Sequence, residues 1–403
     1  MALTNMQSSI CGTVSDSLSG KLIVVGITGS IAAVRSVDLI RDLIRRGAKV
    51  RCVMSKAACQ ILHPYALEYA SENPVITEIT GRVEHVMLCG VEGPADLFMV
   101  APATANTIGK MAQGIDDTPV TTFATTAIGS GKKVMVVPAM HEAMYRHPAV
   151  LKNIEILKSM GIQVIDPRIE EGKAKIADSR DVTLAVERLL GRADLRSRKI
   201  LVTSGATAER IDPIRILTNR ASGKTGTEIA LEAYRRGADV AIVHRARLGL
   251  PFKEIYVESA REMLDGVLSE LKSGYDALIS TAAIGDYTID PSREKIKSGQ
   301  DLVLKMLPTV KVIKTVRSIY PNLKIVGFKA ETFVSDEELL KRARESMQAS
   351  DLDLVVANDV GAGGMGSSEN RVLIVDRQGN ACQAMGKKSK VAGAVLDALV
   401  EEL

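Results

Sequence analysis

The chain has 403 residues, of which 46% are hydrophobic and 25% charged, and its formal net charge is only +4. This length exceeds one ordinary hydrophobic core and predicts two or three domains. No apolar run reaches the roughly 18 residues of a membrane span, and aromatic residues are too few for a base-stacking surface, so neither membrane nor nucleic-acid binding is expected.

The first segment, residues 1–18, is polar and lacks the apolar core of a secretion signal. We interpret it as a flexible tail on a cytoplasmic protein. The five cysteines are scattered and form no C-x-x-C pair, so neither a disulfide framework nor a zinc site is predicted.

Residues 21–55 and 199–243 follow the same plan: an apolar β-branched run, a Gly/Ser/Thr turn, an amphipathic helix, the sequence Arg-Arg-Gly-Ala and a second apolar run. Gly47 and Gly237 stand where a helix C-terminus favours a left-handed residue. Two such βαβ openings predict an α/β protein with two Rossmann-like domains and mainly parallel sheets. The expected apolar face of the first helix consists of Ile31, Val34, Leu39, Leu43 and Ile44.

We place the domains at residues 19–190 and 199–403, with a charged linker at 191–198. Further apolar runs in chain order each end in small and polar residues, which is where parallel sheets bind ligands. These runs cover residues 96–104, 133–140, 276–287, 324–332 and 353–360.

The turn after the first strand, residues 26–32, feeds a helix N-terminus and suits a phosphate group. It is not a full G-x-G-x-x-G, because Thr28 occupies the second glycine position. The next strand ends at Ser55, where an NAD enzyme would carry an acid, and the equivalent point of the second domain is His244-Arg245. Both domains therefore argue against NAD.

The stretch Ala221–Gly226, "ASGKTG", looks like the end of a P-loop, but Thr218 replaces the required glycine. Its Ser/Gly/Lys cluster still suits a phosphate or carboxylate at the start of the following helix.

The first domain resembles the flavin-binding cysteine decarboxylases in "GITGSIAA" from Gly26, "EHVML" around His85, "APATAN" ending at Asn106 and "PAM" ending at Met140. The second resembles phosphopantothenate–cysteine ligases. Its matches are "TSGAT" from Thr203, "NRASGKTG" from Asn219, "TAAIGDY" from Thr281, "EKIK" from Glu294, "VGFKAET" from Val326 and "ANDV" from Ala357. In this order the domains resemble the bifunctional phosphopantothenoylcysteine decarboxylase/phosphopantothenate–cysteine ligase family, as an archaeal-type member.

For the first domain the resemblance implies FMN-dependent decarboxylation to 4′-phosphopantetheine, with the flavin supplying redox chemistry and the protein supplying placement and protons. His85 matches the active-site base. The implied flavin residues are Gly29, Ser30, Ser55 and Thr104. The implied substrate residues are Asn106, Met140, His141, Lys173 and Lys175.

For the second domain the resemblance implies ligation of 4′-phosphopantothenate to cysteine through an acyl-nucleotide made from CTP with Mg²⁺. Lys295 would neutralise nucleotide charge and Asn219 would hold the intermediate, while the metal ligands remain unassigned. The implied nucleotide-binding residues are Gly205, Ala282, Asp286, Lys295, Thr309 and Phe328.

Three departures from the bacterial pattern matter. His141 stands where an Asn contacts the substrate carboxylate. The lid region 170–178 lacks the Cys that protonates the product, which leaves His141, Lys173 or Lys175 to do so. Two nucleotide-contacting lysines align with Ser346 and Ser350, so CTP and ATP both stay open.

The alternative is an active ligase fused to an FMN-binding domain that lacks decarboxylase activity and serves a regulatory or scaffold role. The resemblance also implies a homo-oligomer built on trimers. A threefold and a twofold contact in one chain would close into a dodecamer.

Overall fold

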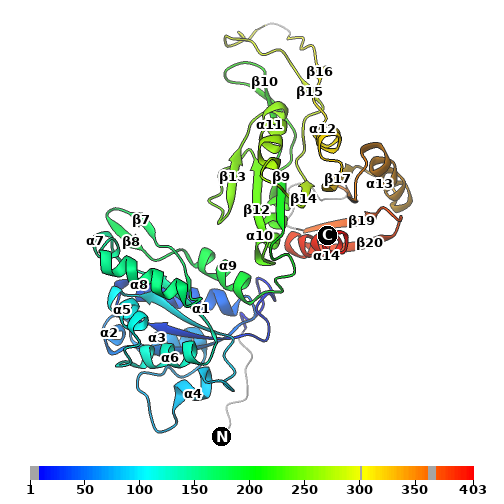
Figure 1. The fold of residues 1–403 in the computed structure, drawn as a ribbon. Coiled ribbons are helices and arrows are strands. Elements are labelled where there is room, and N and C mark those ends of the chain that lie inside the picture. The colour runs from blue at the N-terminus through cyan, green and yellow to red at the C-terminus, as the bar shows by residue number, and fades with distance from the viewer. Residues whose placement is uncertain (1–8, 300–301, 362–368) are drawn as a thin grey trace. The chain divides into compact units, whose positions relative to one another are not determined.

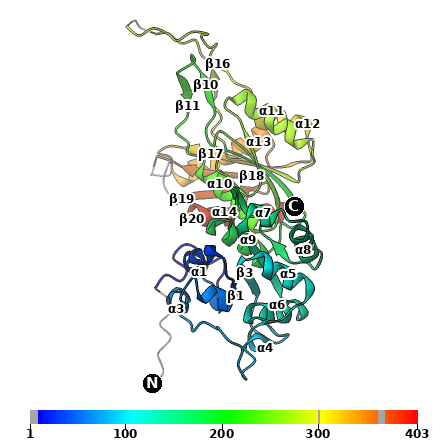
Figure 2. The same ribbon diagram turned by 90° about the vertical axis from the view of Figure 1, so that its left-hand side faces the viewer.

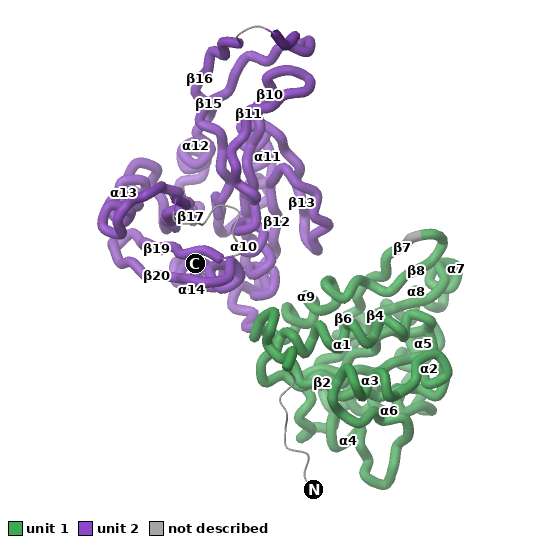
Figure 3. Tube along the Cα trace, turned by 180° about the vertical axis from the view of Figure 1, so that it is seen from behind, with its two compact units in different colours: residues 1–191 green, residues 192–403 purple. Residues whose placement is uncertain are grey.

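The computed structural model describes residues 9–299, 302–361 and 369–403. The chain divides into two compact units, Met1–Gly191 and Arg192–Leu403 (Figure 3). Both have α/β architecture with mainly parallel sheets, which confirms the fold class predicted from the sequence. In the described part of the chain, no helix has the length and apolar character needed to cross a membrane.

Unit 1 is built on a parallel five-stranded sheet with the order β2-β1-β3-β4-β6 (Figure 1). The strands are β1 (Leu22–Ile27), β2 (Lys49–Met54), β3 (Leu97–Ala103), β4 (Lys133–Pro138) and β6 (Gln163–Val164). The strands β1, β3 and β4 are buried on both faces along most of their length, as continuous apolar runs predict, whereas the edge strand β6 is half-buried. The order reverses between β1 and β3, and open α/β sheets bind ligands beyond the carboxyl ends of strands at such a reversal.

Helices cover both faces of this sheet. One apolar core lies beneath α1 (Ser36–Ile44), α3 (Pro64–Ser71) and α9 (Ser179–Leu190). The other lies beneath α4 (Glu84–Cys89), α5 (Ala105–Gln113), α6 (Pro119–Gly129) and α8 (Pro148–Ser159). The short elements are η1 (Ile31–Arg35), α2 (Lys56–Cys59) and α7 (Glu142–Tyr145).

A small antiparallel sheet stands apart from the main sheet of unit 1, with the order β5-β8-β7 (Figure 1). It consists of β5 (Met140–His141), β7 (Arg168–Glu170) and β8 (Lys173–Lys175). Glu171 and Gly172 turn the chain between β7 and β8 with positive φ angles. The region aligned with the bacterial lid is therefore a β-hairpin paired with the residues that follow β4.

Unit 2 contains an eight-stranded sheet with the order β13-β12-β9-β14-β17-β18-β19-β20. The first six strands of this order are parallel, and β19 and β20 are antiparallel to their neighbours. In chain order, the parallel strands are β9 (Lys199–Ser204), β12 (Asp239–His244), β13 (Lys253–Tyr256), β14 (Ala277–Ser280), β17 (Lys324–Glu331) and β18 (Leu354–Asp359). The antiparallel strands are β19 (Glu369–Asp376) and β20 (Ala381–Lys387). The parallel part has the doubly wound order of a Rossmann sheet, with its reversal between β9 and β14.

The faces of this sheet carry different helices. On one face, α10 (Lys224–Arg235) and α14 (Lys388–Glu402) pack together over one core (Figure 2). On the other, α11 (Ala260–Leu271), α12 (Val312–Ile319) and α13 (Asp336–Ser350) cover a second core. Two antiparallel ribbons project from the sheet in Figures 1 and 2: β10 (Ala208–Arg210) with β11 (Ile216–Thr218), and β15 (Tyr287–Thr288) with β16 (Leu307–Pro308).

Two segments that we expected to be loose are packed. In the expected tail, Leu18 is fully buried in the core of unit 1, and the N–H groups of Gly12 and Leu18 donate to carbonyls of Ile44 and Arg46. In the expected linker, Leu195 is buried in unit 2 and Asp194 pairs with Arg236 at 2.6 Å. The tail is anchored by Leu18 together with the half-buried Ile10 and Cys11, and the linker is anchored by Leu195 and the Asp194–Arg236 pair.

The first helix also differs from its predicted form. Gly47 and Gly237 have the expected left-handed φ angles, +92° and +97°. Leu39 is buried as expected, whereas Ile31 and Val34 are exposed. The reason is that residues 31–35 form a separate 3-10 turn, so the 3.6-residue periodicity does not extend back to Ile31.

Candidate functional site

The carboxyl edge of the unit 1 sheet gathers three loops at the reversal between β1 and β3. The backbone of Gly29 is close to the start of α2, because a Cβ on Gly29 would lie 2.6 Å from that of Ala57. Ser30 caps η1 by accepting from the N–H of Ala32, and its hydroxyl donates to the carbonyl of Ala139 at 3.2 Å. The turn after β1 is thus tied to the segment after β4.

The end of β3 joins the same edge. Thr104 caps α5 by accepting from the N–H of Thr107, and its own N–H donates to the buried hydroxyl of Thr28 at 3.1 Å. The Thr28 hydroxyl in turn donates to the carbonyl of Pro102 at 2.7 Å. Asn106 follows in the first turn of α5 and is exposed.

Ser55 completes this edge at the end of β2. Its hydroxyl accepts from the N–H of Ala58 at 3.2 Å and caps α2. A hydroxyl that accepts a bond can still donate its own hydrogen. Gly29, Ser30, Ser55 and Thr104 therefore lie along one sheet edge, where backbone N–H groups and hydroxyls can receive a phosphate.

The hairpin brings two predicted substrate residues together, because His141 of β5 pairs directly with Lys173 of β8. Both are exposed, and Met140 beside them is half-buried. Lys175 instead forms an ion pair with Glu171 at 2.8 Å. His141 and Lys173 thus offer two adjacent donors to an anion.

His85 lies away from the carboxyl edge, on α4, which packs against α6 (Figure 1). Its ring meets the edge of Phe123 with centroids 6.3 Å apart. Nδ1 of His85 is buried and has no hydrogen-bond partner among the described residues. A buried polar atom without a partner is uncommon and marks a functional candidate. Among the described residues, however, no hydrogen bond, ion pair or ring contact joins the His85 side chain to the edge with Gly29.

Unit 2 has a cavity of about 160 Å³ at the carboxyl ends of its strands, next to the reversal between β9 and β14. Three predicted nucleotide residues line it: Gly205 after β9, Ala282 after β14 and Phe328 on β17. The "ASGKTG" stretch forms another wall, and Gly223 begins α10 with φ of +75°.

Three further residues predicted to bind the substrates do not line this cavity but are held by polar contacts in the loops around it: Asn219, Asp286 and Thr309. The side-chain amide of Asn219 donates to the carbonyl of Ala283, which lines the cavity, at 3.1 Å. The N–H of Thr309 donates to the carbonyl of Asp286 at 3.0 Å. The carboxylate of Asp286 forms an ion pair with Lys311 at 2.6 Å, so any phosphate arriving here meets a partly neutralised acid.

Lys295 lies in the loop between β15 and β16 and has no contact with the cavity within the described residues. Its neighbour Ile296 is fixed: Asp212 accepts from the Ile296 N–H at 3.2 Å, and Arg215 donates to the Ile296 carbonyl at 3.0 Å. Burial raises the pKa of Asp212, but hydrogen bonds from Ile214, Arg215 and Ile296 outweigh it and lower the pKa to about 2. Asp212 and Arg215 thus position the loop that carries Lys295.

Sequence reasoning missed three polar residues of the cavity: Asn358, Asn370 and Lys388. Asn358 falls within a recognised motif, but Asn370 and Lys388 come from the antiparallel edge strand β19 and the start of α14. No local pattern marks them, since "GKKSK" resembles a solvated basic run.

A larger cavity of about 530 Å³ lies at the opposite edge of the sheet, near Arg198, Lys324 and the C-terminal Leu403. None of the predicted ligase residues lines it. Among the described residues, no group of three or more His, Cys, Asp or Glu side chains could hold a metal ion.

Comparison with known families accounts for both units. Residues 12–191 match the model described as Flavoprotein, and residues 195–403 match the model of the DNA/pantothenate metabolism flavoprotein C-terminal domain. A "Coenzyme A biosynthesis bifunctional protein CoaBC" from Thermococcus kodakarensis is 50% identical over 374 residues, which cover 91% of this chain and 92% of that protein. The chain belongs to the CoaBC family.

A second family member, from Methanocaldococcus jannaschii, is 37% identical over 370 residues, covering 91% of this chain and 90% of that protein. Both organisms are archaea, in agreement with the archaeal-type resemblance. Among solved structures, the "C-terminal Domain of Coenzyme A biosynthesis bifunctional protein CoaBC" matches 52% of this chain and 97% of its own length, at 28% identity and a TM-score of 0.44.

Proposed function

We propose that the chain catalyses two consecutive steps of coenzyme A biosynthesis. Unit 2 joins 4′-phosphopantothenate to cysteine with CTP, and unit 1 then decarboxylates the product to 4′-phosphopantetheine with FMN. Membership of the CoaBC family supports an enzyme with both activities. The observation that carries the ligase proposal is the cavity at the strand reversal, where Gly205, Ala282 and Phe328 meet the start of α10.

Ligation proceeds in two displacements. A carboxylate oxygen of 4′-phosphopantothenate attacks the α-phosphorus of CTP and releases pyrophosphate, and the cysteine amine then attacks the acyl carbon and releases CMP. Charge on the phosphorus increases in the first step, so fixed cations stabilise it. We assign that role to Lys295, on the loop positioned by Asp212, and assign retention of the acyl-nucleotide to Asn219.

Mg²⁺ usually binds through few protein carboxylates together with substrate phosphates. The lack of a metal-binding cluster in the described residues fits that mode. We therefore propose that Mg²⁺ is held mainly by the nucleotide, whose base and ribose lie along Ala282, Phe328 and Thr309, beside Asp286.

The carboxyl edge of unit 1 fits FMN. Gly29 lets the turn after β1 pack closely against Ala57, the start of α5 at Thr104 faces the same edge, and Ser30 and Ser55 add hydroxyl groups. When bound, FMN would supply the two-electron oxidation that turns the thiol-bearing carbon into an electron sink for decarboxylation, and the reduced flavin would return both electrons to give the saturated thiol.

The residues of the chain supply placement and protons for this second reaction. We assign the base to His85, as the family resemblance implies, and its buried Nδ1 has no hydrogen-bond partner among the described residues. His141 and Lys173, paired across β5 and β8, hold the carboxylate that leaves as CO₂, with Asn106 and Met140 beside the substrate. Without a lid Cys, His141 or Lys173 returns the final proton, because Lys175 is engaged by Glu171.

We further propose that the enzyme is a cytoplasmic homo-oligomer built on trimers, as a dodecamer. Five unpaired cysteines fit a reducing compartment. Exposed apolar side chains on and beside α4 form a patch that association would cover. They are Val83, Val86, Met87 and Val91.

The decisive test incubates the purified protein with 4′-phosphopantothenate, cysteine, Mg²⁺ and CTP or ATP, and measures pyrophosphate and CO₂. Pyrophosphate with neither nucleotide refutes the ligase. Pyrophosphate without CO₂ favours the alternative, a ligase fused to an inactive flavin domain. We expect His85→Asn to abolish CO₂ release alone and Lys295→Gln to abolish ligation alone. Equal loss of both activities in either variant contradicts two separate sites.

The assignment of His141 needs its own test. His141→Asn restores the residue of the bacterial pattern and retains a hydrogen-bond donor. We expect this variant to decarboxylate with a changed pH profile. Full activity with an unchanged profile would show that His141 transfers no proton.

A further inference from the structure

Lys388 is an unusual lysine. It is the first residue of α14, the residue as a whole is only 6% exposed, and it lines the cavity beside the start of α10. In the described part of the chain, its ammonium group has no hydrogen bond and no ion pair. Lys224, the first residue of α10, lines the same cavity and also lacks an ion pair among the described residues.

Burying an ammonium group without a partner is costly. Burial lowers the pKa of Lys388, the nearby charge of Lys224 lowers it further, and Glu228 acts in the opposite direction. No Asp or Glu is among the described residues that line the cavity. The protein therefore keeps two cations at an acid-free cavity, an arrangement that a bound anion would stabilise.

The backbone at the start of two helices also favours an anion in this cavity. Helices α10 and α14 pack against each other (Figure 2), and the first residue of each lines the cavity. Neither has a side chain capping its first turn, since the residues before them are Gly223 and Lys387 without capping bonds. The first N–H groups of each helix and its dipole are thus available to negative charge.

Two glycines let the start of α10 pack closely against the ends of β9 and β14, which form other walls of the cavity. A Cβ on Gly226 would lie 2.2 Å from the hydroxyl of Thr281 and 2.6 Å from that of Ser204. A Cβ on Gly223 would lie 3.0 Å from the backbone of Gly205. Amides from side chains, those of Asn358 and Asn370, complete a polar lining suited to phosphate oxygens.

We propose that Lys388, with Lys224 and the first N–H groups of α10 and α14, forms a binding subsite for a phosphate group of a substrate. The buried cation separates this subsite from an ordinary helix start. For the identity of the phosphate carrier, the inference rests on the ligase function proposed above. The carrier is either 4′-phosphopantothenate or the triphosphate of the nucleotide.

The test measures equilibrium binding of pyrophosphate, CTP, CMP, 4′-phosphopantothenate and pantothenate to the full-length protein and to Lys388→Met. Methionine fills a similar volume without charge. The matched control is Lys390→Met, which removes an exposed lysine from the same helix turn. Loss of a charge-assisted contact predicts about 10- to 100-fold weaker pyrophosphate binding for Lys388→Met, and less than about twofold change for Lys390→Met.

The binding measurements with the substrates show which of them places its phosphate group in the subsite. Weaker binding of 4′-phosphopantothenate, with pantothenate unaffected, assigns the subsite to the phosphomonoester. Weaker binding of CTP, with CMP unaffected, assigns it to the nucleotide. Wild-type affinity of Lys388→Met for pyrophosphate, CTP and 4′-phosphopantothenate overturns the proposal. If the wild type binds pyrophosphate through Lys388 but neither substrate, the ligase proposal fails and the phosphate subsite stands.

Thermal unfolding separates binding from a structural role. Because Lys388→Met removes an unpaired buried charge, we expect its ligand-free midpoint to equal or exceed that of the wild type, and pyrophosphate to raise it less. Lys388→Arg, which keeps the charge, should retain most of the pyrophosphate response. A lower ligand-free midpoint with an unchanged pyrophosphate response would show that Lys388 only stabilises the fold.

Discussion

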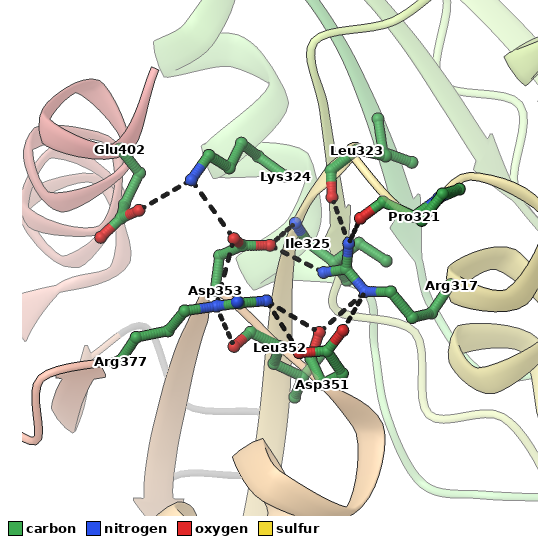
Figure 4. Close-up of polar contacts among 10 residues, drawn as sticks. All are labelled: Arg317, Pro321, Leu323, Lys324, Ile325, Asp351, Leu352, Asp353, Arg377 and Glu402. Atoms are coloured by element: carbon green, nitrogen blue, oxygen red, sulfur yellow. Dashed lines mark hydrogen bonds and ion pairs between the residues drawn. The ribbon is translucent and has the colours of Figure 1, made fainter.

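Asp353 is the centre of a buried ion network at the amino edge of the unit 2 sheet (Figure 4). Its carboxylate accepts from the N–H of Ile325 at 2.9 Å and from Arg317 at 2.8 Å. Lys324 and Arg377 approach the other oxygen at 3.3 and 3.4 Å. We predict that Asp353→Asn destabilises unit 2 while leaving its shape intact.

The expected loss of stability depends on which other acceptors remain for the cations that contact Asp353. Breaking a buried ion pair typically costs about 3–5 kcal/mol. Here Arg317 still donates to carbonyls of Pro321 and Leu323, and Lys324 still pairs with Glu402. Because no cation is left without an acceptor, we expect the low end of that range, about 3 kcal/mol.

The assay is urea unfolding of the full-length protein followed by far-ultraviolet circular dichroism, because the chain has no tryptophan. For a slope of about 3 kcal/mol per molar urea, the midpoint of unit 2 should fall by about 1 M. The control is Asp265→Asn on α11, whose exposed pair with Arg261 at 3.3 Å should contribute about 0.5 kcal/mol or less.

The pH dependence gives a second criterion. Burial raises the pKa of Asp353, but the Ile325 N–H, Arg317, Arg377 and Lys324 outweigh it and hold the pKa below its usual 3.8. The stabilisation is therefore complete above pH 3.8 and is lost as pH falls through the lower folded value. The reasoning is refuted if Asp353→Asn resembles Asp265→Asn at pH 7, or if its deficit persists at low pH.

Three further predictions concern the sites. Asp212→Asn should slow ligation at least about tenfold by releasing the Lys295 loop, with unchanged CO₂ release from supplied 4′-phosphopantothenoylcysteine; equal losses would contradict it. Gly226→Ala should abolish ligation, because its Cβ would overlap Thr281, whereas Gly393→Ala in α14, with open space around it, should be harmless by the same pyrophosphate assay. Gly29→Ala should lower the flavin absorbance of the purified protein through the clash with Ala57, and Gly129→Ala should not.

The carboxyl edges of both sheets could be predicted from the sequence because buried parallel strands have a distinctive apolar pattern. Runs such as Leu22–Ile27 and Ala277–Ser280 are largely apolar on both faces and are followed by small and polar residues, which identifies the carboxyl edge from the sequence alone. Three predicted ligase residues follow strands of this kind or lie within them, and the structure brings them to one cavity: Gly205, Ala282 and Phe328.

Other features depend on packing between distant segments, which no local pattern records. Ile31 has the spacing of a core residue, yet the 3-10 turn exposes it. Leu18 and Leu195 lie in mostly polar segments, and only the shape of the neighbouring core shows that each is an anchor. The hydrogen bond from the Ile296 N–H to Asp212 joins residues 84 positions apart, and no local pattern predicts it either.

Lys388 shows why such a residue is informative once the structure is known. A lysine in "GKKSK" is ordinarily solvated, and its neighbours Lys387 and Lys390 are exposed. Lys388 differs because α14 begins at the cavity and turns that one side chain inward. Burial without a partner lowers stability, and a methionine of similar volume would remove that cost, so the role that we propose for Lys388 is to hold an anion in the cavity.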